Sequence, residues 1–236
     1  MTSLIRRFDG IIFDADGTLI DSNSAHAEAW VEALSEAGYP TTFEILRPLI
    51  GMGGDKILPL LTGLQADSPA GKQIADRRGE IFRDRSLATL EAFPATRELL
   101  ERLRQDGFKL AVASSASPKD LGALLVRADV ADLFSRQSSA DDAENSKPDP
   151  DIVRDALDKL GLPAARTAMI GDTPYDAEAA RRAGVALFAF RCGGHWRDTD
   201  FGAVSAIYDG AADLLGRLES SALYREEPAA EASRAP

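Results

Sequence analysis

Short apolar runs recur along the chain, and each is followed by polar or small residues. They cover residues 10–16, 108–115, 167–172, 185–190 and, with a weaker pattern, 205–209. Runs that are apolar on both faces are typical of the central strands of a parallel sheet. Amphipathic segments of helical period lie between them, at 94–108, 148–162 and 174–185. Strands and helices that alternate in this way predict a doubly wound α/β fold with a mostly parallel sheet.

The alternation is interrupted after the first apolar run, where the pattern becomes helical throughout and contains no convincing strand. We therefore expect an all-helical insert after the first strand, with hinges near Asp21–Asn23 and Glu91–Pro94. The C-terminal end is rich in small and polar residues and contains Pro, which is typical of a flexible tail. The expected division is an α/β core at 1–22 and 94–224, a helical cap at 23–93, and a tail at 225–236.

Composition narrows the classes of partner and compartment. The 236 residues carry a net charge of −11, which disfavours a nucleic-acid-binding groove. No apolar stretch approaches the roughly 20 residues that span a bilayer, so no membrane contact is expected. Cys192 is the single cysteine and excludes an intrachain disulfide, which suits a cytoplasmic protein. No His at a spacing typical of a Cys–His pair accompanies Cys192, so it is not a credible nucleophile. The protein is expected to be a monomer or homodimer.

Chemistry-bearing side chains follow the predicted strands. Asp14 and Asp16 follow the first run, Ser114 ends the second, Asp172 ends the third, and Lys147 precedes a predicted helix. In an open α/β sheet, ligands bind beyond the carboxyl ends of the strands, so we expect these side chains to converge. Two carboxylates about 4 Å apart repel by roughly 4 kcal/mol at an effective dielectric constant of 20. A hard divalent cation such as Mg²⁺ would turn this repulsion into a binding site.

Phosphoryl transfer is a reaction that uses two acids, a hard metal, a hydroxyl and a lysine. One carboxylate attacks phosphorus and forms an aspartyl-phosphate. A second carboxyl, kept protonated beside its neighbour, gives a proton to the leaving oxygen. The metal and Lys147 neutralise the phosphoryl oxygens, to which Ser114 and loop amides donate hydrogen bonds.

Four segments carry a resemblance to a known family. In order, "DADGTLIDS", "AVASSAS", "SKPDP" and "GDTPYDAEAA" resemble the four motifs of the haloacid dehalogenase-like hydrolase superfamily. The resemblance covers residues 8–22 and 94–220 and implies a Rossmann-like core. The helical insert looks like the C1 cap of the phosphoglycolate phosphatase and β-phosphoglucomutase branch.

The resemblance also implies roles for individual residues. Asp14 would be the nucleophile, Asp16 the general acid/base, and Ser114 and Lys147 the phosphate-binding residues. Mg²⁺ would be bound by Asp172, by Asp14 and by the Asp16 carbonyl. Further candidates of the core are Ser115, a rival to Ser114, and Asp176, an outer or alternate metal ligand.

Several residues near the expected site keep two interpretations. His26 is either an ordinary helix residue or a neighbour of the active site. The Gly51–Gly54 stretch, with Gly53 and Gly54 followed by Lys56, is either a helix–helix turn or the substrate loop of the cap. The Arg191–Trp196 stretch is either a plain loop or a substrate contact.

The leading functional prediction is a cytoplasmic, Mg²⁺-dependent phosphatase that acts on a small phosphorylated metabolite. A phosphomutase of the β-phosphoglucomutase type is the alternative. Such mutases carry an Arg in the cap loop, whereas this loop reads "IGMGGDK"; Lys56 or Lys72 would have to substitute. A 2-haloacid dehalogenase is disfavoured by the acid at Asp16, and an Asp-phosphorylated signalling domain by the large insert.

Overall fold

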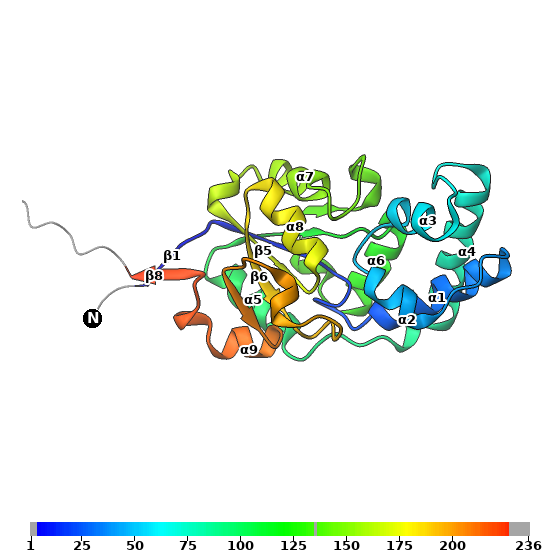
Figure 1. Cartoon of the computed structure of the whole chain (residues 1–236). Coiled ribbons are helices and arrows are strands. Elements are labelled where there is room, and N and C mark those ends of the chain that lie inside the picture. The colour runs from blue at the N-terminus through cyan, green and yellow to red at the C-terminus, as the bar shows by residue number, and fades with distance from the viewer. Residues whose placement is uncertain (1–3, 135, 227–236) are drawn as a thin grey trace, which may run out of the picture.

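The computed structural model describes residues 4–134 and 136–226, and a six-stranded sheet forms its centre (Figure 1). The strands are β2 (Gly10–Phe13), β3 (Lys109–Ala113), β4 (Arg136–Ser138), β5 (Thr167–Gly171), β6 (Ala186–Phe190) and β7 (Ala206–Tyr208). They are all parallel, in the order β4, β3, β2, β5, β6, β7. The chain steps outward from β2 in one direction and then returns to β5 on its other side. This doubly wound α/β sheet confirms the expected fold class.

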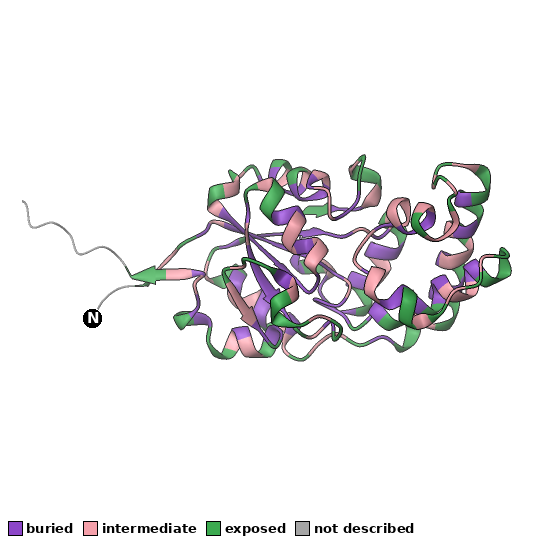
Figure 2. Cartoon of the chain, viewed as in Figure 1, coloured by how far each residue is buried: buried purple, intermediate pink, exposed green. Residues whose placement is uncertain are grey.

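Both faces of the sheet are covered by helices, and its central strands are buried (Figure 2). On β2, Ile11 and Phe13 belong to one buried cluster and Ile12 belongs to the other, as the two-residue period of a strand requires. The helices of the core are α5 (Thr96–Gln105), α6 (Pro118–Arg127), α7 (Asp151–Leu160), α8 (Pro174–Ala183) and α9 (Ala211–Gly216). Apolar residues of α5, α6 and α9 join the first cluster, and those of α7 and α8 join the second.

The segment after β2 is helical. It contains α1 (Asn23–Glu36), α2 (Phe43–Leu46), α3 (Gly54–Thr62) and α4 (Pro69–Arg85), with 3₁₀ turns at Arg47–Leu49 and Leu87–Thr89. Between Asn23 and Thr89 no strand forms, as the helical pattern predicts. These cap helices gather at one end of the molecule (Figure 1). The bounds 23–93 for a separate domain stay a prediction.

The end of the chain differs from the expectation of a tail at 225–236. β8 (Tyr224–Glu226) pairs antiparallel with β1 (Leu4–Arg6), so Arg225 and Glu226 belong to a two-stranded ribbon. The ribbon is short and partly exposed, and its two strands lie more than 200 residues apart in sequence, so no local pattern predicts it. The rest of the expected tail, 227–236, lies outside the described residues. Within the described part of the chain, every helix is too short or too polar to cross a membrane.

Candidate active site

The carboxyl ends of the central strands bring the candidate residues together. Asp14 follows β2 directly, Ser114 follows β3 and Asp172 follows β5, while Lys147 lies in the loop before α7. Successive strands are added on one side of β2 as far as β4 and then on its other side from β5 onward, so the strand order switches between β2 and β5. This is the switch point where ligands bind in such sheets. Gly17 turns the chain away from this point with φ of +76°, and a Cβ there would lie 2.2 Å from the Asp172 carboxylate. Only glycine fits this turn.

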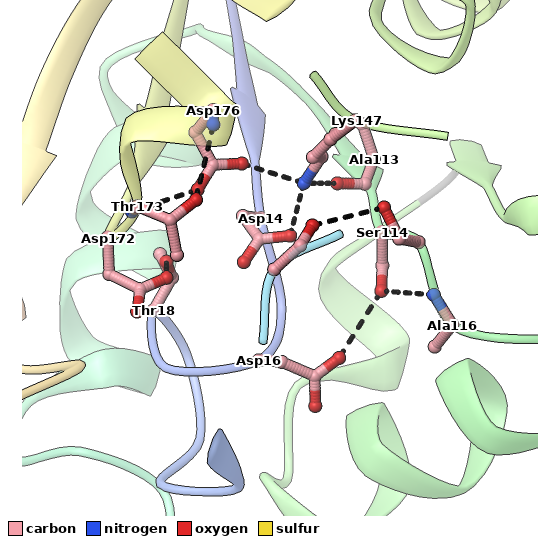
Figure 3. Close-up of polar contacts among 12 residues, drawn as sticks. Asp14, Asp16, Thr18, Ala113, Ser114, Ala116, Lys147, Asp172, Thr173 and Asp176 are labelled. Atoms are coloured by element: carbon pink, nitrogen blue, oxygen red, sulfur yellow. Dashed lines mark hydrogen bonds and ion pairs between the residues drawn. The ribbon is translucent and has the colours of Figure 1, made fainter. Parts of the chain in front are cut away.

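Lys147 lies at the centre of the cluster and is 1% exposed. Its Nζ contacts Asp14 Oδ1, lies 2.8 Å from Asp176 Oδ1 and donates to the Ala113 carbonyl oxygen at 2.7 Å (Figure 3). Burial alone would lower the pKa of this ammonium, but Asp14 and Asp176 reverse the effect and raise it above its ordinary value. Lys147 is therefore a permanent positive charge inside an acidic site.

Three buried carboxylates surround the space next to Lys147. Ligand atoms of Asp14, Asp172 and Asp176 lie within 4.8 Å of one another. Burial raises the pKa of Asp14 well above 3.8, although Lys147 opposes the shift. Burial and the neighbouring Asp176 raise the pKa of Asp172 to about 7. Such crowding of acids is unfavourable without a cation.

The donor set fits a hard divalent cation. Thr18 Oγ1 donates to Asp172 Oδ1 at 3.0 Å, and Asn23 Nδ2 donates to Asp172 Oδ2 at 2.8 Å, which fixes the orientation of this carboxylate. The Asn23 Oδ1 atom is buried and has no hydrogen-bond partner. Carboxylate and amide oxygens are the ligands that Mg²⁺ and Ca²⁺ prefer. Asp176 lies inside the cluster rather than outside it, and it also caps α8 through Thr173.

The Asp16 carboxylate points away from the three clustered acids. Its Oδ1 accepts from Ser22 Oγ at 2.5 Å and lies 2.7 Å from His26 Nε2, and its Oδ2 accepts from Ser114 Oγ at 3.4 Å. Burial would raise the pKa of Asp16, but His26, Ser22 and Arg78 together lower it to about 2. The expectation of a carboxyl kept protonated beside Asp14 is therefore wrong for this conformation, because hydrogen bonds stabilise the ionised form.

The two candidate phosphate-binding serines, Ser114 and Ser115, contact different groups. Ser114 Oγ accepts from the Ala116 backbone N–H at 3.1 Å besides donating to Asp16 (Figure 3). Ser115 Oγ donates instead to the Gly51 carbonyl oxygen of the cap at 3.4 Å. Both serines line the cavity that contains Asp14 and Asp16.

This cavity has a volume of about 50 Å³ and lies between core and cap. The lining residues are Asp14, Asp16, His26, Trp30, Ile50, Gly51, Met52, Gly53, Gly54, Arg78, Ser114, Ser115 and Ala116. His26 stacks on the Phe82 ring at a centroid distance of 3.9 Å, which presents its Nε2 to Asp16. The Gly53 N–H donates to Ser146 Oγ at 3.0 Å, and a Cβ at Gly53 would lie 2.5 Å from that oxygen, so the loop approaches the core as only glycine permits.

Other candidate residues lie outside this cavity. Lys56 Nζ pairs with Asp149 Oδ2 of the core at 2.6 Å. Arg191 forms ion pairs with Asp198 and Asp209. In the same loop, the Gly193 carbonyl oxygen accepts a hydrogen bond from the buried Arg47 of the cap.

Sequence reasoning missed several residues that line or support the site. Trp30 is a buried residue of the helical cap, and it also lines the cavity. Arg78 was not singled out, because it belongs to no motif. Asn23 was expected only as part of a hinge, since it lies just beyond the first motif, and Met52 only as part of the Gly51–Gly54 stretch. Their positions depend on how the cap helices pack on the core.

The sequence of the chain matches a known protein family. Residues 11–190 match the model of the haloacid dehalogenase-like hydrolases, and the chain belongs to this family. It falls in the branch of phosphoglycolate phosphatases and phosphoglucomutase-like proteins, and it is a hydrolase of the phosphatase type.

Particular relatives and structures support this assignment. The chain is 33% identical over 223 residues to "Probable phosphatase IndB" of Dickeya dadantii, covering 89% of this chain and 96% of the relative. It is 32% identical to a phosphoglycolate phosphatase of Aliivibrio fischeri, covering 78% and 84%. Among solved structures, a hydrolase from Pseudomonas syringae superimposes with a TM-score of 0.83 at 28% identity, covering 89% of this chain and 98% of that one.

Proposed function

We propose that the protein is a Mg²⁺-dependent phosphatase that hydrolyses a small phosphate monoester through an aspartyl-phosphate at Asp14. The observation that carries the proposal is the position of Asp14: it is buried, it contacts the permanently charged Lys147, and it shares a cation-binding cluster with Asp172. A nucleophilic carboxylate needs positive charge around the phosphoryl group that it attacks.

Asp14, Asp172 and Asp176 would hold Mg²⁺, which supplies charge neutralisation at the phosphoryl oxygens when bound. Lys147 adds a fixed positive charge beside Asp14 and Asp176, and Ser114 offers a hydroxyl. An Asp14 oxygen attacks phosphorus, the bond from phosphorus to the leaving oxygen breaks, and Asp16 gives that oxygen a proton. In the second step Asp16 takes a proton from the water that attacks phosphorus, which releases phosphate and restores both carboxyl groups.

The ionised state of Asp16 without substrate fits this cycle. A bound phosphate ester brings negative charge next to the carboxylate, and like charge raises a carboxyl pKa. Substrate binding would therefore protonate Asp16, and the first step transfers this proton to the leaving oxygen. His26, whose Nε2 lies 2.7 Å from Asp16 Oδ1, is the side chain placed to exchange it.

The phosphatase reaction is favoured over the phosphomutase reaction. The two lysines considered as substitutes for a mutase arginine do not line the cavity: Lys56 pairs with Asp149, and Lys72 lines a separate groove between α1 and α4. The phosphatase relatives agree with this choice.

A panel of phosphate monoesters tests the proposal. The purified protein is incubated with two- to six-carbon phosphate esters and Mg²⁺, and released phosphate is measured with and without EDTA. We expect stoichiometric, Mg²⁺-dependent phosphate release for at least one ester and none from Asp14→Asn. Isomerised sugar phosphate without free phosphate would favour the mutase, and chelator-resistant release would refute the role of the metal.

A further inference from the structure

A groove lies at one edge of the sheet, where β3 and β4 begin and α5 and α7 end. Its volume is about 350 Å³, and its lining shares no described residue with the catalytic cavity. Lys109 of the groove and Ser114 of the catalytic site are five residues apart along β3 and the residue that follows it, which corresponds to about 16 Å of extended strand. A ligand in the groove and a substrate at Asp14 can therefore be bound at the same time.

The charge of this groove differs from that of the whole chain. The chain has 27 Lys and Arg residues against 38 Asp and Glu residues, so acids outnumber cations. Among the described residues that line the groove the order is reversed, with four cations and one acid. An anion is thus attracted to this place on a chain whose net charge repels it. The charged lining residues are Arg104, Lys109, Arg136, Lys159 and Asp132.

Two of these charges are neutralised by ion pairs. Both oxygens of the Asp132 carboxylate accept from Arg97, whose Nη1 and Nη2 lie 2.9 Å and 3.0 Å from Oδ1 and Oδ2. Lys159 Nζ lies 2.7 Å from Asp155 Oδ2 and 3.0 Å from Asp142 Oδ1. Neither Asp132 nor Lys159 therefore decides the charge that a ligand meets in the groove.

Arg104 and Lys109 are exposed and form no ion pair within the described part of the chain. Arg104 Nη1 donates to the Asp132 carbonyl oxygen at 3.5 Å, and Lys109 Nζ donates to the Leu160 carbonyl oxygen at 3.3 Å. A guanidinium has five N–H donors and an ammonium has three, so most of these donors remain for a ligand. The C-termini of α5 and α7 each carry about half a negative charge, which together offsets only one of the two cations.

The deeper part of the groove is apolar. Four buried side chains contribute to its lining, and their burial places them below the exposed cations. Ligand sites of small molecules combine apolar walls with a few charged or polar groups and have volumes of about 300–1,000 Å³, a range that includes this groove. The apolar residues are Phe108, Leu110, Leu133 and Leu160.

We propose that this groove binds a small organic anion, with a doubly charged phosphate or dicarboxylate head at Arg104 and Lys109 and a short apolar body over Phe108 and Leu133. A guanidinium and an ammonium side by side suit an oxyanion with two charges, since each donates charge-assisted hydrogen bonds. The site goes beyond the proposed phosphatase reaction and does not depend on it or on Mg²⁺.

NMR titration of the ¹⁵N-labelled protein in EDTA at pH 8 tests the proposal. Phenylphosphonate is the main probe, because it has a dianionic head and a ring but no ester bond to hydrolyse. We expect saturable shifts of the Phe108, Leu133 and Leu160 amides with a Kd on the order of 1 mM or tighter. Methylphosphonate should bind at least about fivefold more weakly, since it lacks the ring. Phthalate, a dicarboxylate with the same ring, shows which of the two heads the groove prefers.

A double variant, Arg104→Gln with Lys109→Gln, should weaken phenylphosphonate binding at least about 10-fold, because both charged donors are lost. The matched control is Arg127→Gln with Arg154→Gln. It removes two exposed cations of α6 and α7 that lie outside the groove, so the Kd should stay within about twofold of the wild type.

Several results would overturn the proposal. They are an absence of shifts, shifts confined to the catalytic residues Asp16 and Ser114, and equal losses of affinity in the two double variants. Equal affinity for the two phosphonates would refute the apolar part of the site. If the first double variant does not fold, salt decides: raising NaCl from about 50 to about 500 mM should weaken wild-type binding several-fold, and salt-independent binding refutes the proposal. None of these measurements requires phosphatase activity, so the proposed function stands or falls separately.

Discussion

Replacing Asp172 by asparagine tests the electrostatics of the acidic cluster. Burial and Asp176 raise the pKa of Asp172 from 3.8 to about 7. Between about pH 4 and pH 7 the Asp172 carboxyl is protonated in the folded protein, whereas in the unfolded chain it is already ionised. Because one pKa unit corresponds to about 1.4 kcal/mol, ionising Asp172 in the metal-free fold costs roughly 4 kcal/mol at pH 8.

The sign of the pH dependence follows from the raised pKa. The unfolding free energy of the metal-free protein falls as the pH rises from about 4 to about 7, since the folded state binds more protons in this window. Asp14, whose pKa burial also raises, acts in the same direction. Asp172→Asn removes one of these ionisations. The new amide oxygen keeps the hydrogen bond from Thr18, and the unpartnered Asn23 Oδ1 can accept from the new N–H once the Asn23 amide turns over.

Urea unfolding followed by circular dichroism, in EDTA at pH 5 and pH 8, measures the effect. We expect Asp172→Asn to be more stable than the wild type at pH 8, with an advantage that grows by roughly 3 kcal/mol between the two pH values. Mg²⁺ should stabilise the wild type and not the variant. Asp158→Asn, on the exposed side of α7, controls for net charge. A variant that is less stable than the wild type at pH 8, or an advantage independent of pH, would refute this reasoning.

Three further substitutions test individual roles. Asp14→Asn should lower kcat at least about 10³-fold with an unchanged circular dichroism spectrum, because the nucleophile is lost; substantial residual activity would exclude Asp14. Asp16→Asn should slow alkyl phosphates far more than aryl phosphates with good leaving groups, as compared by kcat/KM, whereas equal losses would argue against proton donation. Lys147→Met should destabilise the metal-free protein by about 3–5 kcal/mol in urea unfolding at pH 7, since it leaves buried carboxylates without their counter-charge; a change below about 1 kcal/mol would contradict this.

The central strands and the strand-end residues could be predicted because both follow from local patterns. Continuous apolar runs mark β2, β3, β5 and β6, and the parallel arrangement then brings Asp14, Asp172 and Lys147 to one edge. β4 was not predicted, since its three residues, Arg136–Ser138, are polar and lie at the edge of the sheet. The β1–β8 ribbon depends on pairing between the two ends of the chain.

The state of the site residues could not be predicted from motifs. Asp16 was expected to hold a proton because Asp14 is two residues away, yet Ser22 and His26 turn its carboxylate aside and stabilise its charge. Asp176 was ranked below Asp172, but both lie in the same cluster. Arg78 belongs to no motif, and it reaches the cavity only because α4 packs beside α1 over the core.

The central claim is that Asp14 carries the phosphoryl group during turnover. The direct test is a single turnover with a substrate found in the ester panel, quenched with acid and reduced with borohydride, followed by peptide mass spectrometry. Borohydride converts an aspartyl-phosphate to homoserine, so the account predicts homoserine at position 14 and at no other aspartate. Phosphate release with an unmodified Asp14, or homoserine at Asp16 instead, would contradict it.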